Sequence, residues 1–224
     1  MSNEFEQISV KPGFMKHNGG VLFKTISETE YEFKSTIDEN HLNAAGITHG
    51  GYLSALIDAG AGTAAHRASG NSPCVTISLD LKFIGASKVG DKITGFTKIL
   101  KKTNTLIFFN HKIFHIINFD QISIKNVFMN HDGGILFRAI SETEYEFKSI
   151  INVNHLNTAG ITHGGYLSAL IDAGAGTAAH RASENSPCVT ISLDLKFIGA
   201  SKVGDEITGY TKILKKTNTL VFLF

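Results

Sequence analysis

The sequence predicts an α+β fold that occurs twice in tandem, each copy combining one long apolar helix with a sheet. The segment Ala45–Ser69 recurs without change as Ala159–Ser183, and the wider match aligns Phe5–Phe109 with Phe119–Leu223, with 87 of 105 positions identical. This period exceeds the roughly 20–50 residues of solenoid repeats, so each repeat is a small domain. The helix is too apolar for a surface position, and strands flank it on both sides. This pattern therefore predicts a helix wrapped by a sheet rather than a parallel βαβ arrangement.

The elements of the first repeat follow from its hydrophobic periodicity. Val21–Ile26 and Tyr31–Ile37 alternate apolar and polar residues, which predicts a hairpin. In the stretch from Gly50 to Ser69, leucine, isoleucine, glycine and alanine recur at helical spacing up to a Gly-Asn-Ser-Pro breaker. Alternation then predicts three more strands, at Val75–Phe83, Lys92–Leu100 and Thr105–Phe109. The second repeat should follow the same order from Ile135 to Phe224.

The repeat also sets the domain boundaries. We expect one domain over residues 1–118 and a second over residues 119–224. The junction Asn110–Asn118 lacks the Pro, Gly and Ser content of a flexible linker. It is therefore expected to continue the preceding strand and to hold the two repeats close together.

Composition narrows the class of protein. With 21 Lys and Arg against 20 Asp and Glu, the net charge of +1 gives no indication of a nucleic-acid partner. Cys74 and Cys188 occupy equivalent positions, which favours reduced thiols over a disulfide framework. The N-terminus lacks the features of a secretory signal, and no apolar run approaches the roughly 18 residues of a membrane span. The expected location is the cytoplasm, or an organelle of similar redox state.

One carboxylate stands out in the apolar helix. Asp58, copied as Asp172, has only small residues at i±3 and i±4, so another molecule or subunit can approach it. It could be a structural residue that is paired at a buried interface, because an unpaired buried carboxylate is costly. It could equally be a general base or nucleophile whose pKa is tuned by apolar surroundings. Spacing alone leaves both interpretations open.

The step His49-Gly50-Gly51 opens the same helix, and His163-Gly164-Gly165 is its copy. Paired glycines can simply permit tight packing. They also leave amide groups at the positive end of a helix, where a developing oxyanion would be stabilised. The motif becomes more specific because Asn43 or Asn157 precedes it and the aspartate follows it.

Together these residues resemble the hotdog-fold thioesterases. The run N-x-x-G-x-x-H-G-G, then L-x-D, V-T-x-S-L-D-L-K-F and V-G-D, is most similar to the phenylacetyl-CoA thioesterase type and its acyl-CoA thioesterase relatives, over most of each repeat. The resemblance implies a long helix wrapped by an antiparallel sheet. It also implies active sites between two hotdog units, with residues from both.

The resemblance also implies roles for individual residues. Asp58 and Asp172 match the catalytic acid, and the amides of Gly50 and Gly164 match the oxyanion donors. Asn43 and Asn157 match the side chain that orients the carbonyl or the water, while Thr76 and Thr190 match a hydroxyl that assists the water or the acid. The remaining candidates are expected near the substrate: His49, Gly51, His163 and Gly165 from the motif, with Tyr52 and Tyr166 beside it. The histidines are expected to be structural rather than to act as bases.

Two consequences concern assembly. The repeats are expected to form an internal double hotdog, with Asn43 and Gly50 facing Asp172, or else to share sites between chains in a homo-oligomer. Compared with the family, each repeat lacks the last edge strand, and the second ends at Phe224 partway through a strand. An unpaired edge of this kind could be covered by the other repeat or by another chain.

The expected function is therefore hydrolysis of acyl-CoA thioesters to the free acid and coenzyme A. No metal and no cofactor are expected, since coenzyme A enters as part of the small-molecule substrate. One alternative is a non-catalytic acyl-CoA binding module or a defective truncated duplicate. Another is an acyl-thioester dehydratase or hydratase on the same fold, although that chemistry usually places His and an acid together in a different motif.

Overall fold

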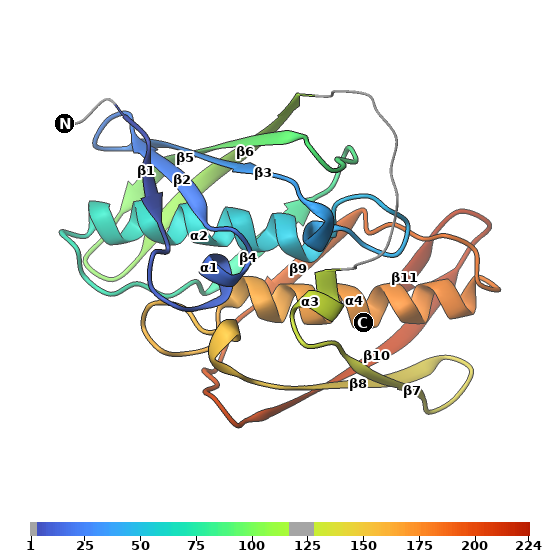
Figure 1. Cartoon of the computed structure of the whole chain (residues 1–224). Helices are drawn as coiled ribbons and strands as arrows, with labels where there is room; N and C mark the ends of the chain where they lie inside the picture. Colours follow the sequence, from blue (N-terminus) through green and yellow to red (C-terminus); the bar gives the residue numbers. More distant parts are fainter. Residues whose placement is uncertain (1–3, 117–127) are drawn as a thin grey trace.

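In the computed structural model, each repeat wraps a sheet around one long helix, and the two repeats pack together (Figure 1). The structure describes residues 4–116 and 128–224. The expected boundary between residues 118 and 119 lies outside the described residues. The elements of the first repeat are β1 (Glu6–Ile8), α1 (Phe14–His17), β2 (Val21–Thr25), β3 (Glu30–Thr36), the 3₁₀ turn η1 (Glu39–His41), α2 (Gly50–Ala68), β4 (Ser78–Lys82), β5 (Lys92–Lys102) and β6 (Ile107–Ile116). Those of the second are α3 (Phe128–His131), β7 (Leu136–Ala139), β8 (Glu144–Ile150), η2 (Val153–His155), α4 (Gly164–Ala182), β9 (Ser192–Lys196), β10 (Glu206–Lys216) and β11 (Val221–Leu223).

The sheets are antiparallel and follow one topology in both repeats. The first has the order β1-β2-β3-β5-β6, and the second has the order β11-β10-β8-β7. Strand β4 leaves its own repeat and pairs with β9, so that Asp80 lies opposite Asp194 and Leu79 opposite Leu195. This two-stranded ladder joins the repeats through main-chain hydrogen bonds.

The two long helices pack against each other in antiparallel directions (Figure 1). Gly51 lies against Ala169, and Gly165 lies against Ala55. A Cβ atom at Gly51 would lie 2.2 Å from the Ala169 Cα, a distance that no pair of carbon atoms tolerates. The glycine therefore allows the first turn of α2 to touch the second turn of α4, and the repeat symmetry produces the same contact with the two helices exchanged.

The short helices α1 and α3 cross to the opposite repeat. The Phe14 amide donates to the Leu156 carbonyl at 2.8 Å, and the Phe128 amide donates to the Leu42 carbonyl at 2.6 Å. Both rings are fully buried, and Phe14 packs edge-on against Tyr166 while Phe128 packs against Tyr52. Each repeat thus completes the core of the other, and the predicted close packing of the two halves is confirmed.

Most expected elements are confirmed, with two differences in strand length. The strand expected over Val75–Phe83 begins only at Ser78, because the preceding residues run past α2 and the ladder to β9 starts later. The strand expected over Thr105–Phe109 extends as β6 to Ile116, so the junction does continue the strand up to that residue. Within the described residues, β6 and β11 are edge strands of their sheets.

Candidate active site between the repeats

The first candidate site forms where α2 begins. His49 is the N-cap of this helix, and its Nδ1 accepts a hydrogen bond from the Gly51 amide at 3.0 Å. The same amide donates to Oδ2 of Asp172 at 3.1 Å, although Asp172 belongs to α4 of the other repeat. The His49 Nδ1 lies 3.2 Å from this oxygen. The carboxylate therefore sits at the positive end of a helix, which favours negative charge.

A hydroxyl group holds the other oxygen of the carboxylate. The Thr190 Oγ1 donates to Oδ1 of Asp172 at 2.5 Å. Thr190 lies between α4 and β9, in the segment that passes the helix before the ladder begins. Because the threonine binds Oδ1, the carboxylate presents Oδ2 to the start of α2.

The second candidate site repeats this geometry with the repeats exchanged. Thr76 Oγ1 donates to Oδ1 of Asp58 at 2.5 Å, and His163 Nδ1 lies 3.3 Å from Oδ2. A Cβ at Gly164 would lie 3.0 Å from Oδ2 of Asp58. The structure thus brings each predicted aspartate and its threonine together with the His-Gly-Gly step of the opposite repeat.

Gly50 keeps this site open. A Cβ at this position would lie 3.0 Å from Oδ2 of Asp172 and 3.4 Å from Cζ of Phe83. Any side chain would therefore fill the space beside the carboxylate. As the first residue of α2, Gly50 also carries one of the helix amides that have no acceptor within the helix.

Burial determines the charge of the motif histidines. His49 and His163 are 7% and 8% exposed, and Asp58 and Asp172 are 7% and 6% exposed. Burial lowers the pKa of both imidazoles, while the neighbouring aspartate acts in the opposite direction. Both histidines are thus favoured in the neutral form, in which Nδ1 can accept the amide hydrogen bond that caps the helix.

Asn43 and Asn157 lie in the loops that precede the two long helices. The Asn43 Oδ1 accepts hydrogen bonds from the amides of Ala45 and Ile47 at 2.9 and 3.3 Å, and Asn157 makes the equivalent pair. The carbonyl end of each side chain therefore shapes its own loop. The NH₂ end is the part of Asn43 that can donate to another group.

Tyr52 and Tyr166, which were expected near the substrate, lie in the core. Both have 0% exposure. The Tyr52 hydroxyl lies 2.6 Å from Ser35 Oγ, and its ring stacks on His41 with centroids 3.7 Å apart. Tyr166 makes the corresponding contacts with Ser149 and His155. These contacts place both tyrosines in the core, where they have structural partners. The sequence did not indicate this position, because helical periodicity alone does not show which protein surface a face of the helix contacts.

No role was predicted for Phe83 and Phe197, which lie beside Gly50 and Gly164. The ring of Phe197 also lines an apolar cavity of about 210 Å³ under α4, together with Leu167, Ile171, Ile198 and Ile207. A Cβ at Gly164 would lie 3.5 Å from Cζ of Phe197, so this ring lies between the Asp58 site and the cavity. Its position as the last residue of the V-T-x-S-L-D-L-K-F run gave no signal of this role.

A known protein family matches each of the two repeats separately. The family model described as "Thioesterase superfamily" matches residues 45–116 and again residues 159–224, which is more than half of the chain. The chain belongs to the thioesterase superfamily. Each match contains the complete Gly-Gly, Asp and Thr set of one repeat, so the thioesterase pattern occurs twice in this protein.

Two relatives of this thioesterase-superfamily chain have functional names. It is 41% identical over 73 residues to a Pseudomonas aeruginosa protein named "Putative esterase", covering 32% of this chain and 54% of the relative. It is 26% identical over 97 residues to mouse acyl-coenzyme A thioesterase 13, covering 43% of this chain and 69% of that protein. The chain therefore spans about half the length of the Pseudomonas relative.

Solved structures confirm the hotdog fold over most of the chain. The tesB protein of Mycobacterium avium subspecies paratuberculosis superposes with a TM-score of 0.57 at 10% sequence identity, covering 90% of this chain and 86% of that one. Identity at this level supports the fold alone. Among the described helices, none is both long and apolar enough to cross a membrane.

Proposed function

We propose that this chain hydrolyses acyl-CoA thioesters at two equivalent sites, one on each side of the repeat interface. The observation that carries the proposal is the approach of Asp172 Oδ2 to the Gly51 amide and His49, repeated for Asp58 and His163. An acid can activate water, a hydroxyl can orient the acid, and amides at a helix start can stabilise the oxyanion that forms in thioester hydrolysis. Here they meet at a site that neither repeat could form alone.

The proposed reaction begins with a water molecule activated by Asp172. With Oδ1 held by Thr190, Oδ2 takes a proton from the water as its oxygen attacks the thioester carbon. The carbonyl oxygen gains negative charge and is stabilised by the Gly50 amide at the positive end of α2. The C–S bond then breaks, the thiolate of coenzyme A takes the proton from Asp172, and the free acid leaves with the carboxylate of Asp172 restored. Direct attack by the carboxylate, followed by hydrolysis of the anhydride, is the nucleophilic form of the same proposal.

Asn43 has a supporting role in this proposal. Its Oδ1 is bound to two loop amides, and this fixes the direction of its side chain. Its NH₂ group can then donate to the thioester carbonyl or position the water. Asn157 serves the second site in the same way, and neither site needs a metal or a cofactor.

The acyl group is proposed to be apolar. The cavity behind Phe197 is lined mainly by leucine, isoleucine and phenylalanine and is adjacent to the Asp58 site. Apolar groups gain roughly 25 cal/mol per Å² when such a surface leaves water. We therefore expect faster turnover of medium aliphatic or aryl acyl-CoAs than of acetyl-CoA.

The experiment is release of the coenzyme A thiol by the full chain and by three variants, Asp58→Asn, Asp172→Asn and the double variant. Because the two sites are equivalent, each single variant should keep about half of the rate, and the double variant should lose at least a hundredfold. Asp80→Asn is the matched control, since Asp80 is an exposed aspartate in β4 that pairs with Lys82.

Other outcomes would reject the proposal. An unchanged rate in the double variant would rule out the aspartates as catalytic groups. Binding of acyl-CoA without thiol release by the wild type would instead support the binding module. Hydration of an enoyl-CoA, measured by loss of its conjugated absorbance, would support the hydratase alternative.

A further inference from the structure

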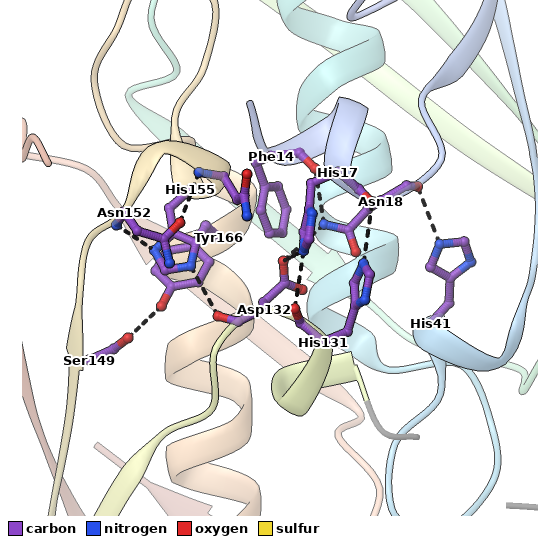
Figure 2. A network of polar contacts seen from close by, with 11 residues as sticks. Phe14, His17, Asn18, His41, His131, Asp132, Ser149, Asn152, His155 and Tyr166 are labelled. Carbon is purple, nitrogen blue, oxygen red and sulfur yellow. Dashed lines mark hydrogen bonds and ion pairs between the residues drawn. The ribbon is translucent and has the colours of Figure 1, made fainter. Parts of the chain in front are cut away.

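The repeat interface contains a second buried carboxyl group, Asp132, which lies away from both candidate sites. It follows α3 and meets Asn18, the equivalent residue of the first repeat, which follows α1 (Figure 2). Asn18 is 1% exposed and Asp132 is 2% exposed. The repeats therefore bring an amide and a carboxyl group into contact in the buried interior of the protein.

One hydrogen bond between these side chains is already made. The Asn18 Nδ2 donates to Phe14 O at 3.0 Å and to Asp132 Oδ1 at 3.1 Å. A main-chain carbonyl can only accept, so this contact identifies the nitrogen end of the Asn18 amide. Both of its hydrogens are used.

The other two oxygens of the pair lack partners. Among the residues that the structure describes, Asn18 Oδ1 and Asp132 Oδ2 are the buried side-chain oxygens with no hydrogen bond. Two acceptor oxygens cannot satisfy each other. A buried group left in this state costs free energy, and a buried charge costs more. A proton on Asp132 Oδ2 would remove the buried charge and turn this oxygen from an acceptor into a donor.

Nearby histidines do not provide this proton. His17 and His131 stack with centroids 4.1 Å apart, and Nε2 of each lies within 3.2 Å of the main-chain oxygen of the other. His155 Nε2 lies 3.0 Å from the Asp132 carbonyl, and His41 Nε2 lies 3.3 Å from the Asn18 carbonyl. These nitrogens therefore donate to carbonyl oxygens.

The remaining ionisable groups are weak partners for Asp132. His17 Nε2 lies 3.8 Å from Oδ1, the oxygen that Asn18 already binds. The Tyr166 hydroxyl faces away from the pair and bonds to Ser149 (Figure 2). Thus none of these described groups donates to Oδ2.

We propose that Asp132 is a neutral carboxylic acid that forms a two-hydrogen-bond pair with the Asn18 amide across the repeat interface. Asn18 Nδ2 donates to Oδ1, and protonated Oδ2 donates to Asn18 Oδ1. The proton comes from solvent during folding, and loss of it leaves a buried carboxylate with one oxygen that lacks a hydrogen-bond donor. This interface contact is independent of the proposed hydrolysis and makes the pairing of the repeats sensitive to pH.

The titration of Asp132 agrees with this arrangement. Burial raises its pKa from 3.8 to about 6, and this effect exceeds the opposing influence of the Asn18 hydrogen bond and of His131 and His17. The folded state therefore holds the proton more tightly than the unfolded state. This contribution to stability is complete below about pH 4 and is lost as the pH rises through about 6, a change of roughly a hundredfold in the folding equilibrium constant.

Infrared difference spectroscopy on the full chain tests the protonation state directly. We expect the wild type minus Asp132→Asn spectrum at about pH 5 to contain a carboxylic acid C=O band that shifts in D₂O and disappears above about pH 7. Asp132→Asn should fold, because two amides can form the same pair of hydrogen bonds. A carboxylate band at about pH 5 would overturn the proposal.

Thermal unfolding from about pH 4.5 to 8 gives a second, independent readout. The Tm of Asp132→Asn minus the Tm of the wild type should increase as the pH rises through about 6. The exchanged variant Asn18→Asp/Asp132→Asn keeps one acid and one amide, so it should restore the pH dependence that Asp132→Asn lacks. Parallel curves for the wild type and Asp132→Asn would contradict a buried titrating acid. If Asp132→Asn fails to fold, selective ¹³C labelling of aspartate carboxyl groups in the wild type reports the same pKa.

Discussion

Gly51 and Asp172 lie 121 positions apart in the chain and are joined by a hydrogen bond of 3.1 Å between the amide of one and the carboxylate of the other. The contact exists because α2 and α4 cross where Gly51 meets Ala169, one helical turn before Asp172. Packing of the helices and assembly of the candidate site therefore depend on the same glycine.

Substitution of Gly51 should destabilise the interface. In Gly51→Ala the new methyl group would overlap Ala169, and overpacking of this kind costs about 1–3 kcal/mol or more. The matched control is Gly62→Ala in the same helix, where nothing lies within 4 Å of the new Cβ. That variant should gain about 0.5–1 kcal/mol in the free energy of unfolding. Urea denaturation of both variants checks the difference, and equal stabilities would contradict the packing described.

The threonine hydroxyls should affect activity more than stability. Thr76→Val with Thr190→Val removes the hydrogen bond to Oδ1 of each aspartate while keeping the side-chain shape. We expect the rate of thiol release to fall about tenfold or more because the carboxylate loses its orientation. Thr63→Val is the control, since its hydroxyl donates to the Ala59 carbonyl within α2. A similar fall in the control would exclude a specific role.

The motif histidines should make stability depend on pH in the direction opposite to Asp132. Burial lowers the pKa of His49 and His163 below the ordinary 6.5. Their contribution is therefore complete above about pH 6.5 and is lost as the pH falls below that value, because the unfolded chain binds the protons more readily. His49→Asn with His163→Asn keeps a helix-capping side chain and should reduce this loss. Urea denaturation midpoints of the wild type and the variant, measured from about pH 5 to 8, check this prediction. An equal dependence of the midpoint on pH in both proteins would argue against buried neutral histidines.

The short helix α1, which packs against the second repeat, should be essential for stability. Phe14 is fully buried between His163, Tyr166 and Phe128, so Phe14→Ala should cost about 3–5 kcal/mol. Phe108 is 49% exposed, and Phe108→Ala provides a control of equal chemistry. Differential scanning calorimetry should show a large fall in Tm for the first variant and a small one for the second. A large fall in both would indicate a general sensitivity to loss of phenylalanine.

The sequence by itself determined what depends on local pattern. The duplication, the hairpin of β2 and β3 and the limits of α2 follow from periodicity and from the Gly-Asn-Ser-Pro breaker. The motif also selected Asp58, Gly50 and Thr76, which the structure brings into two clusters with their copies. The hairpin and α2 depend on near neighbours along the chain, whereas the duplication is read by comparing the two halves of the sequence and the site residues by the resemblance to a family.

Only the tertiary structure decided which copies meet and which face of each helix is buried. Antiparallel packing of α2 on α4 pairs Asp172 with the first repeat and turns Tyr52 into the core, where it bonds to Ser35. It also placed Asn18 opposite Asp132, a pair whose chemistry neither repeat contains alone. These relationships depend on contacts between residues more than a hundred positions apart, and no periodicity within one repeat records them.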